Sequence, residues 1–487
     1  MANLFPQILA AAVDERAHNI FYRQTQLERL CSSLITRIPD IREAIAEDYG
    51  HSPAEVALEI HLVLEAVKRE YASLQPSKAH EEEYLIAAGK DAPSRTRPAG
   101  IVYIEPCTHS LFYSVVVPLA AATAAGNCVI VLLENNIRTL SSLLRQILSS
   151  ALAQDTFAIV SSAIRDESLL NSAIFVDQNS TAKWPKANEL ASAAATRTIA
   201  VVDRTADVQL AAHELVAARF SFRGRSAYAP DCVLVNEFVK HAFLQAVVSE
   251  CAKLGGVAPI TGDEKSMRGG AADKVQEQVS SLREADPGVR VILQEHKMAV
   301  VDLPSRTSHF LAKKLDAPVL MVHAITSLDD AIDLISSTED GPCLAAYHFG
   351  NPAQAKYLTQ FIDANISFIN HIPREVLIGP AYPTGHPINL AARYPRELFT
   401  LQRPAYIERR SAPAVFDAAL TSSSNATAQQ LLRDASSPLK VLKRSKGGGV
   451  GFFEQGFLMN AAILLTTTIS VSGFGIYWWV RRGRSPW

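Results

Sequence analysis

The chain of 487 residues has little that would mark a secreted, metal-binding or nucleic-acid-binding protein. Its six cysteines, at positions 31, 107, 128, 232, 251 and 343, are scattered and form no Cys-x-x-Cys pair. This argues against a disulfide framework or a zinc site and favours a reducing compartment. With 47 Lys and Arg against 49 Asp and Glu, the net charge of −2 offers nucleic acid no general attraction. The N-terminus lacks the basic start and long apolar core of a secretory signal.

Long apolar runs are also scarce, with one exception near the C-terminus. Residues 457–480, FLMNAAILLTTTISVSGFGIYWWV, carry no charge, and 24 residues at about 1.5 Å each can cross about 30 Å of hydrocarbon. A Gly-rich hinge precedes the run, aromatic residues end it, and the basic tail 481–487 follows. A buried terminal helix is the alternative. We expect a single-pass tail anchor with the bulk cytosolic, in the mitochondrial outer or peroxisomal membrane, or alternatively the endoplasmic reticulum.

The first part of the chain is expected to be helical. Apolar residues recur at three- and four-residue steps over residues 26–73, and the triplet HSP at 51–53 interrupts them. Ser52 is expected to cap the second helix, with Pro53 in its first turn. Residues 1–75 are therefore predicted to form an N-terminal helical part.

Two α/β regions follow. The first has predicted strands at 99–106 and 128–133 with a small-residue helix at 114–127 between them, a βαβ order that implies a parallel sheet. The second begins with a strand at 197–203 and continues the alternation. Its further predicted elements are a helix at 205–220, a strand at 232–238, a helix at 238–253, a strand at 318–325, a helix at 328–337, and strands at 344–350 and 366–371.

Several stretches resemble the aldehyde dehydrogenase superfamily, and most closely its membrane-tailed fatty aldehyde dehydrogenase class. They are EDYGHSPAEVALEI, RPAGIVYIEPCTHSLFYSVVVPLAAATAAGNCVIVLL, IAVVDRTADVQLAAHELVAARF, YAPDCVLVNEFV and DAPVLMVHAITSLDDAIDLISS, in this order. The resemblance covers about residues 25–405. It implies an α/β fold of two Rossmann-like parallel-sheet lobes, a small oligomerisation strand region and a C-terminal transmembrane helix.

The resemblance also implies a division of the chain. The expected parts are a cofactor-domain-like lobe at 76–196, a catalytic-domain-like lobe at 197–398, an oligomerisation strand at 399–411, a flexible linker at 412–456 and the transmembrane helix. The strand at 399–411 implies a homodimer, or pairing with a related subunit. The bilayer is the other expected partner, and no nucleic acid is expected.

The family reaction needs a thiolate nucleophile, an Asn and a backbone N–H for the oxyanion, and a Glu as general base. By resemblance, the nucleophile position falls at Ala227, the oxyanion position at Thr108 and the base position at Ala193. An alkyl group cannot attack a carbonyl, and a Thr hydroxyl is shorter than an Asn side chain. The three catalytic positions are therefore degenerate.

The family positions for NAD or NADP are degenerate as well. The Lys that holds ribose is replaced by Leu132, and an acidic ribose contact falls at Lys314. The pyrophosphate turn places Asp177 where its negative charge would repel phosphate. No cofactor is therefore expected, or NAD or NADP if the chain is active. No histidine or carboxylate spacing indicates a metal site.

Three functions are consistent with these residues. The first is a membrane-anchored pseudoenzyme that acts in binding or scaffolding. The second is a divergent NAD(P)-dependent dehydrogenase that oxidises a lipophilic aldehyde to a carboxylic acid, in specialised metabolism. The third is a hydrolase-type activity assisted by Cys107 and His109, since a histidine beside a cysteine lowers the thiol pKa.

Other reactive side chains are interpreted more simply. Arg223 and Arg225, on either side of Gly224, are exposed loop residues or bind an anion. The remaining cysteines are expected in the core. Four further residues are expected in loops: His371, Arg374, His386 and Arg393.

Overall fold

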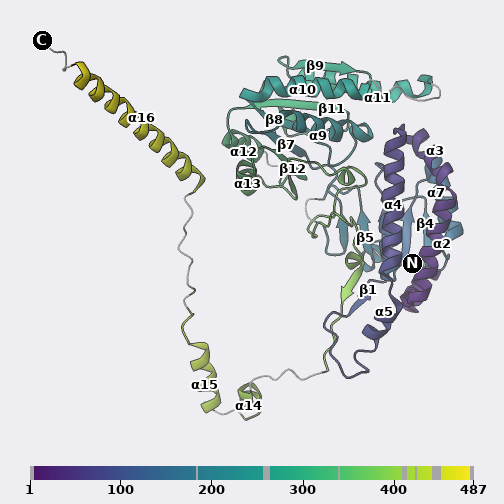
Figure 1. The fold of residues 1–487 in the computed structure, drawn as a ribbon. Helices are drawn as coiled ribbons and strands as arrows, with labels where there is room; N and C mark the ends of the chain where they lie inside the picture. The colour runs from purple at the N-terminus through teal and green to yellow at the C-terminus, as the bar shows by residue number, and fades with distance from the viewer. Residues whose placement is uncertain are drawn as a thin grey trace. The chain divides into compact units, whose positions relative to one another are not determined.

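The computed structural model describes residues 5–182, 185–255, 264–337, 341–407, 414–422, 425–440, 442 and 451–482. The chain divides into two compact units, Met1–Glu408 and Arg409–Trp487, which are described separately (Figure 1). The larger unit contains two mainly parallel sheets and the helices that pack on them. The α/β fold predicted from the alternating pattern is therefore confirmed.

Three long helices form the predicted N-terminal layer: α2 (Ile20–Thr36), α3 (Ile38–Tyr49) and α4 (Pro53–Ser73). Helix α4 begins where the sequence predicts. Ser52 Oγ accepts from Glu55 N (3.3 Å), and Glu55 Oε2 accepts from Ser52 N (2.7 Å). This capping box satisfies N–H groups that a helix start leaves unpaired. A second break, at Arg37 between α2 and α3, is not visible in the apolar period.

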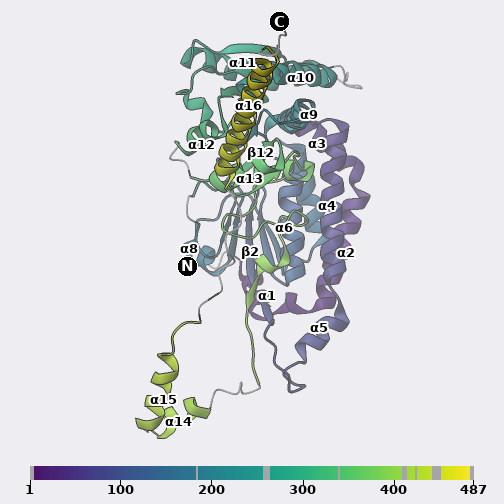
Figure 2. The ribbon, with the colours of Figure 1, turned by 60° about the vertical axis from the view of Figure 1, so that its left-hand side comes forward.

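A five-stranded parallel sheet follows, with strand order β4-β3-β2-β5-β6. Its strands are β2 (Ile101–Glu105), β3 (Cys128–Leu132), β4 (Phe157–Val160), β5 (Ile174–Asp177) and β6 (Glu189–Ala191). Helix α6 (Leu111–Ala125) lies between helix α4 and this sheet (Figure 2). From β2 the chain first adds β3 and β4 on one side of that strand and then β5 and β6 on the other side. The strand order therefore reverses between β2 and β5. A parallel sheet holds ligands beyond the carboxyl ends of its strands at such a point.

The second sheet has seven strands in the order β13-β12-β7-β8-β11-β10-β9, all parallel to their neighbours except β9. The strands are β7 (Thr198–Val202), β8 (Cys232–Asn236), β9 (Arg290–Glu295), β10 (Met298–Asp302), β11 (Val319–Ile325), β12 (Ala345–Phe349) and β13 (Ser367–Ile369). The antiparallel hairpin of β9 and β10 was not predicted. Most other strands lie within two residues of their predicted ends.

Helices pack on both sheets. They include α1 (Pro6–Val13), α7 (Thr139–Ala151), α8 (Glu167–Ser172), α9 (Val208–Phe220), α10 (Glu237–Gly255), α11 (Glu264–Ala285), α12 (Leu328–Ser336) and α13 (Pro352–Phe361). Helix α5 (Pro76–Glu83) contacts α2 instead. The late extended segment contributes strand β14 (Thr400–Gln402), which pairs antiparallel with β1 (Thr96–Pro98). That pairing, within one chain, forms a short ribbon outside both sheets.

The smaller unit corrects one expectation. Residues 412–456, expected as a flexible linker, contain helices α14 (Ala414–Ser422) and α15 (Asn425–Ala435) and the start of α16 (Phe452–Arg482). The predicted membrane span lies within α16, where Glu454–Trp479 is long and apolar enough to cross a bilayer by length and composition. Most of the basic tail lies outside the described residues.

Candidate functional site

The predicted nucleophile position lies in the loop between α9 and β8. Helix α9 is followed by a short 3-10 turn, Ser221–Gly224, in which Phe222 (φ 49°), Arg223 (φ 56°) and Gly224 (φ 67°) are left-handed. A Cβ at Gly224 would lie 2.8 Å from Pro318 Cα, so only glycine fits there. Glu55 Oε1 accepts from Phe222 N (2.7 Å) and fixes the turn to the start of helix α4. The loop therefore reaches Ala227 from a tightly held turn.

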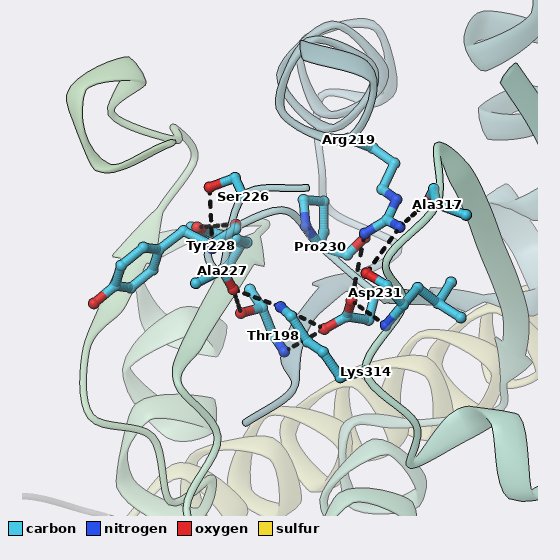
Figure 3. Close-up of polar contacts among 11 residues, drawn as sticks. Thr198, Arg219, Ser226, Ala227, Tyr228, Pro230, Asp231, Lys314 and Ala317 are labelled. Atoms are coloured by element: carbon cyan, nitrogen blue, oxygen red, sulfur yellow. Dashed lines mark hydrogen bonds and ion pairs between the residues drawn. The ribbon is translucent and has the colours of Figure 1, made fainter. Parts of the chain in front are cut away.

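Ala227, whose side chain is a methyl group, is 9% exposed. Two side chains donate hydrogen bonds to its carbonyl oxygen. Thr198 Oγ1 donates to the Ala227 carbonyl oxygen at 3.0 Å, and Lys314 Nζ donates to the same oxygen at 2.5 Å (Figure 3). Thr198 is the first residue of β7, and Lys314 precedes β11. The backbone of the loop is thus bonded to the start of β7 and to the segment before β11, the strands on either side of β8.

Asp231, at the end of the loop, is the centre of this network and is 1% exposed. Its carboxylate accepts from Thr198 N (2.7 Å), Leu315 N (3.1 Å), Lys314 Nζ (3.1 Å) and Arg219 Nη1 (3.3 Å) (Figure 3). Arg219 is fully buried and also donates to the Ala317 carbonyl. One buried cation, Arg219, and one partly buried cation, Lys314, therefore share one carboxylate. Burial lowers the pKa of Lys314, while the charge of Asp231 opposes that shift.

Lys314 was placed by resemblance at the second ribose contact. In the structure its ammonium is bonded to Asp231 and to the Ala227 carbonyl. A cation at this point cannot accept a hydrogen bond from a ribose hydroxyl, which is what an acidic residue would do. Lys314 therefore belongs to the support of the loop.

Thr108, at the predicted oxyanion position, does lie close to the loop. Its exposed hydroxyl accepts from Arg225 Nη2 at 3.4 Å, two residues before Ala227. Arg225 Nε also lies 3.6 Å from Asp316 Oδ1, while Arg223 packs against Gly50. The structure thus places Thr108 beside Arg225, which precedes Ala227 in the same loop. The polar groups there are a hydroxyl and a guanidinium, with no thiol bonded to either.

Cys107 and His109 do not form an activated pair. Cys107 Sγ donates to the His109 carbonyl (3.0 Å) and lies 3.1 Å from Ser114 Oγ, and burial raises its pKa to about 11. Burial also lowers the pKa of His109 to about 4, so the ring is neutral and donates from Nε2 to the Leu377 carbonyl (3.0 Å). The expectation that histidine lowers this thiol pKa is wrong, because both groups are desolvated and bonded to backbone oxygens.

The predicted cofactor positions lie along the carboxyl edge of the five-stranded sheet. Leu132 ends β3, Asp177 ends β5, and Ala193 lies in the turn after β6, half-buried. Glu105 ends β2 directly beside Asp177 in the sheet register. Burial raises the pKa of both carboxyls, and the charge of Asp177 further raises that of Glu105.

These residues do not fit a dinucleotide. Two neighbouring carboxylates border the point where the strand order reverses, so they would repel a pyrophosphate. Leu132 offers a ribose no polar atom. Lys314, on the other lobe, is bonded to Asp231. NAD and NADP therefore have no matching set of contacts among these positions.

Arg393 lies in a loop, as expected from the sequence, but it is buried there. It is 3% exposed, and its guanidinium stacks on Tyr382, 4.2 Å from the ring centroid. Its Nη2 donates to the carbonyls of residues 375, 376 and 378. Of the other three residues, His371 is exposed, His386 is partly exposed, and Arg374 pairs with Glu214 (2.9 Å).

Sequence reasoning missed the residues that hold the site. The sequence analysis assigns no role to Arg219, Thr198 or Asp231. Gln178, also missed, accepts from Cys107 N (3.0 Å) and donates to the Ser114 carbonyl (2.8 Å). The available signal was a lone arginine in the apolar end of α9, since a buried arginine requires an acidic partner.

Two mainly parallel sheets, with the loop before β8 carrying the site, define a protein of the aldehyde dehydrogenase fold. Residues 188–380 match the model of the aldehyde dehydrogenase family. Substrate-bound Staphylococcus aureus AldH has a TM-score of 0.65 and 19% identity, over 84% of this chain and 95% of that chain. GapN, the glyceraldehyde-3-phosphate dehydrogenase of Methanocaldococcus jannaschii, solved with NADP, has a TM-score of 0.62 and 16% identity, over 82% and 92%.

Curated relatives agree with this fold. Mouse aldehyde dehydrogenase family 3 member A2 is 23% identical over 397 residues, or 72% of this chain and 75% of that protein. Family 3 member H1 of Arabidopsis thaliana is 22% identical over 389 residues, or 73% and 78%. The chain therefore contains an aldehyde dehydrogenase family domain, and the resemblance found in the sequence is confirmed.

Proposed function

We propose that this chain is a membrane-anchored protein of the aldehyde dehydrogenase fold that binds its ligands or partners without oxidising aldehydes. The observation that carries the proposal is Ala227, whose methyl group stands at the nucleophile position while its carbonyl is fixed by Thr198 and Lys314. A missing nucleophile removes the covalent step. Loss of a single contact that stabilises the transition state lowers the reaction rate by about a thousandfold or more.

The cofactor edge supports the same proposal. Glu105 and Asp177 are register partners at the edge where the resemblance puts the pyrophosphate turn, and their negative charge would oppose pyrophosphate binding. The dehydrogenase alternative needs that edge to hold NAD or NADP. The hydrolase alternative needs a reactive Cys107, whose pKa of about 11 leaves little thiolate near neutral pH.

The direct test measures cofactor binding and turnover with the full chain in detergent micelles. Thermal unfolding is followed with and without NAD or NADP, since a ligand at a hundred times its Kd adds about 2.7 kcal/mol to the stability. We expect no shift, and no NADH or NADPH from aliphatic or aromatic aldehydes. Ala227→Cys should also stay inactive, because a thiol alone does not restore the cofactor edge. Turnover by the unaltered chain would overturn the proposal.

The anchor has its own test. The chain without residues 451–487 should appear in the soluble fraction of lysed cells, while the full chain sediments with membranes. Leu464→Lys places a charge within the apolar span, which costs about 2.5–3.5 kcal/mol in insertion. Leu464→Ala is the matched control and should remain membrane-bound. Continued membrane association without residues 451–487 would refute the anchor.

We further propose that the chain pairs with a second copy or a related subunit through the β1–β14 ribbon. Leu401 on this ribbon and Ile407, which follows it, are 41% and 49% exposed, which leaves apolar surface to cover. Light scattering after size-exclusion chromatography should give a dimer that Leu401→Asp converts to monomer. A monomeric unaltered chain, with no related subunit bound, would contradict this.

A further inference from the structure

The turn Ser221–Gly224 precedes the loop that carries Ala227 and is strained. Phe222 (φ 49°), Arg223 (φ 56°) and Gly224 (φ 67°) are left-handed in succession. Glycine adopts this conformation freely, whereas Phe222 and Arg223 adopt it only where surrounding contacts hold them. The conformation of the turn therefore depends on residues outside it.

Those contacts come from the corner between helices α3 and α4, which comprises residues 50–52, and from the start of α4. Glu55 Oε1, in the first turn of α4, accepts from Phe222 N at 2.7 Å. The Arg223 guanidinium occupies the space that a Cβ at Gly50 would need. The turn is thus attached to this part of the helical layer at two consecutive residues.

The Phe222 side chain is 2% exposed and contacts two histidine rings. Its ring centroid lies 5.2 Å from that of His51, in the corner, and 6.0 Å from that of His109, which precedes helix α6. Both contacts are edge-to-face, with interplanar angles of 86° and 83°. Aromatic pairs favour this geometry, so the two rings help to hold the strained turn.

Neither histidine ring is bonded to a carboxylate in the part of the chain that the structure describes. His51 Nδ1 is buried without a hydrogen-bond partner there, and the ring stacks on Tyr49, which is itself covered by Arg138. His109 Nε2 donates to the Leu377 carbonyl (3.0 Å). A proton added to either ring would therefore gain no paired anion.

The charged groups that face the two rings are mainly cations. Arg223 and Arg225 face His51. Arg225 also faces His109, as does His51 itself. The acid that faces His109 is Asp316, which is 66% exposed and pairs with Arg225. Protonation would therefore place a buried positive charge beside arginines, which is unfavourable.

The pKa values agree with this arrangement. Burial, together with the arginine charges, lowers the pKa of His51 and of His109 to about 4. In an open turn, where the rings contact water, the pKa would be near the ordinary value of about 6.5. Neutral rings therefore stabilise the closed turn fully above about pH 6.5, and this contribution is lost as the pH falls to about 4.

We propose that the turn Ser221–Gly224 is an acid-sensitive switch, in which protonation of His51 and His109 releases Phe222 from the corner. The released turn leaves the left-handed region, so its strain is relieved at the same time. Because the turn leads directly into the loop at Ala227, acid would change the conformation of the candidate site. This conformational change does not depend on whether the chain oxidises aldehydes.

The test is hydrogen–deuterium exchange of the full chain in detergent micelles at about pH 7.5 and about pH 5.5, read by peptide mass spectrometry. Protection is expressed relative to the chemical exchange rate at each pH. A pKa of about 4 in the closed turn and about 6.5 in the open turn favours opening about tenfold for each histidine at the lower pH. We expect the protection of residues 222–228 to fall at least about tenfold. A smaller fall would overturn the proposal.

Strand β8 provides the internal reference. Its amides, in Cys232–Asn236, follow the loop and should keep their protection at about pH 5.5. An equal loss of protection in β8 would mean that acid unfolds the whole sheet, and a local switch would then be ruled out.

Two variants sharpen the result. His51→Phe keeps an aromatic ring against Phe222 but cannot take up a proton, so protection of residues 222–228 at about pH 5.5 should be about tenfold higher than in the unaltered chain. His61→Phe, at an exposed histidine of α4, is the matched control and should behave as the unaltered chain does. An unchanged fall in protection in His51→Phe would overturn the proposal. If His51→Phe fails to fold, the difference between residues 222–228 and β8 in the unaltered chain still decides the matter.

Discussion

Two regions of the larger unit bury a carboxylate to the same extent and treat it differently. Asp231, in the loop before β8, and Glu59, on helix α4, are each 1% exposed. Asp231 accepts four hydrogen bonds, two of them from cations. Glu59 Oε1 accepts one, from Tyr113 N in the first turn of α6 (3.2 Å), and its Oε2 has no partner among the described residues.

The two buried carboxylates differ in the number of hydrogen bonds that the fold provides to them. The four partners of Asp231 satisfy its side-chain oxygens and, through Lys314, hold the loop at Ala227 in place. Glu59 lacks such partners, so burial raises its pKa to about 7. The loop that contains the predicted nucleophile position is thus held by a satisfied network, while an unsatisfied acid is found between two helices.

We expect Asp231→Asn to have the largest effect on the free energy of unfolding. The substitution leaves Lys314 and Arg219 buried without an anion, and breaking a buried ion pair in this way costs about 3–5 kcal/mol. Urea denaturation followed by near-UV circular dichroism should show the loss in the free energy of unfolding. Asp316→Asn, at an exposed acid, is the control and should change stability by about 0.5 kcal/mol or less. Equal effects of the two substitutions would mean that the network does not support the loop.

Glu59→Gln should act in the opposite direction above neutral pH. The folded pKa of about 7 lies above the unfolded value, so the folded state binds the proton more tightly. That stabilising contribution is full below about pH 4.5 and declines as the pH rises to about 7. The glutamine variant should therefore be about 3 kcal/mol more stable than the unaltered chain at about pH 8 and similar to it at about pH 4.5.

The measurement is urea denaturation at a series of pH values. Glu65→Gln, on the exposed side of the same helix, is the control and should reproduce the pH profile of the unaltered chain. A profile for Glu59→Gln with the same slope as the unaltered chain would show that Glu59 is charged in the folded state.

Lys314→Met tests how much of the network depends on one cation. Asp231 would keep Arg219 and two backbone N–H groups, so the expected loss is about 1–2 kcal/mol, less than for Asp231→Asn. The free energy of unfolding is measured in urea, with Lys313→Met as the matched control. A loss as large as that of Asp231→Asn would make Lys314, and not Arg219, the main counter-ion.

The smallest expected effect concerns the link between the two regions. Glu55 belongs to the capping box of α4 and also accepts from Phe222 N in the turn before Ala227. Ser52→Ala removes one cap hydrogen bond and should cost about 1 kcal/mol. Ser73→Ala, at the other end of the helix, is the control. A neutral result in urea denaturation for Ser52→Ala would mean that Glu55 alone fixes the helix start.

Much of the fold could be predicted from the sequence because its signals are local. Ser52, Pro53 and Glu55 lie within four residues, and the strands around the central helix α6 are nearly continuous apolar runs. The helices within 412–456 were missed because a stretch rich in Ser and Ala can form a linker or a short helix. The hairpin of β9 and β10 also has no strong apolar alternation, since β9 is mostly exposed.

The site was harder to predict because its contacts are distant in sequence. Aligning family motifs located Ala227, Thr108 and Lys314. It could not show that Lys314 bonds to Asp231, 83 residues away, or that Arg219 is buried beside both. Likewise, nothing in the local sequence of Arg393 indicates that this loop residue is buried among tyrosines.

Helix α16 has a further consequence. Its apolar stretch of 26 residues is about 39 Å long, which exceeds the hydrocarbon thickness of about 30 Å in an average bilayer. An inserted α16 must therefore tilt, or the surrounding lipids must stretch, at a modest cost for each ångström of mismatch. Sterol-rich bilayers relieve part of that cost, so the anchor would partition toward the thicker of two membranes offered to it.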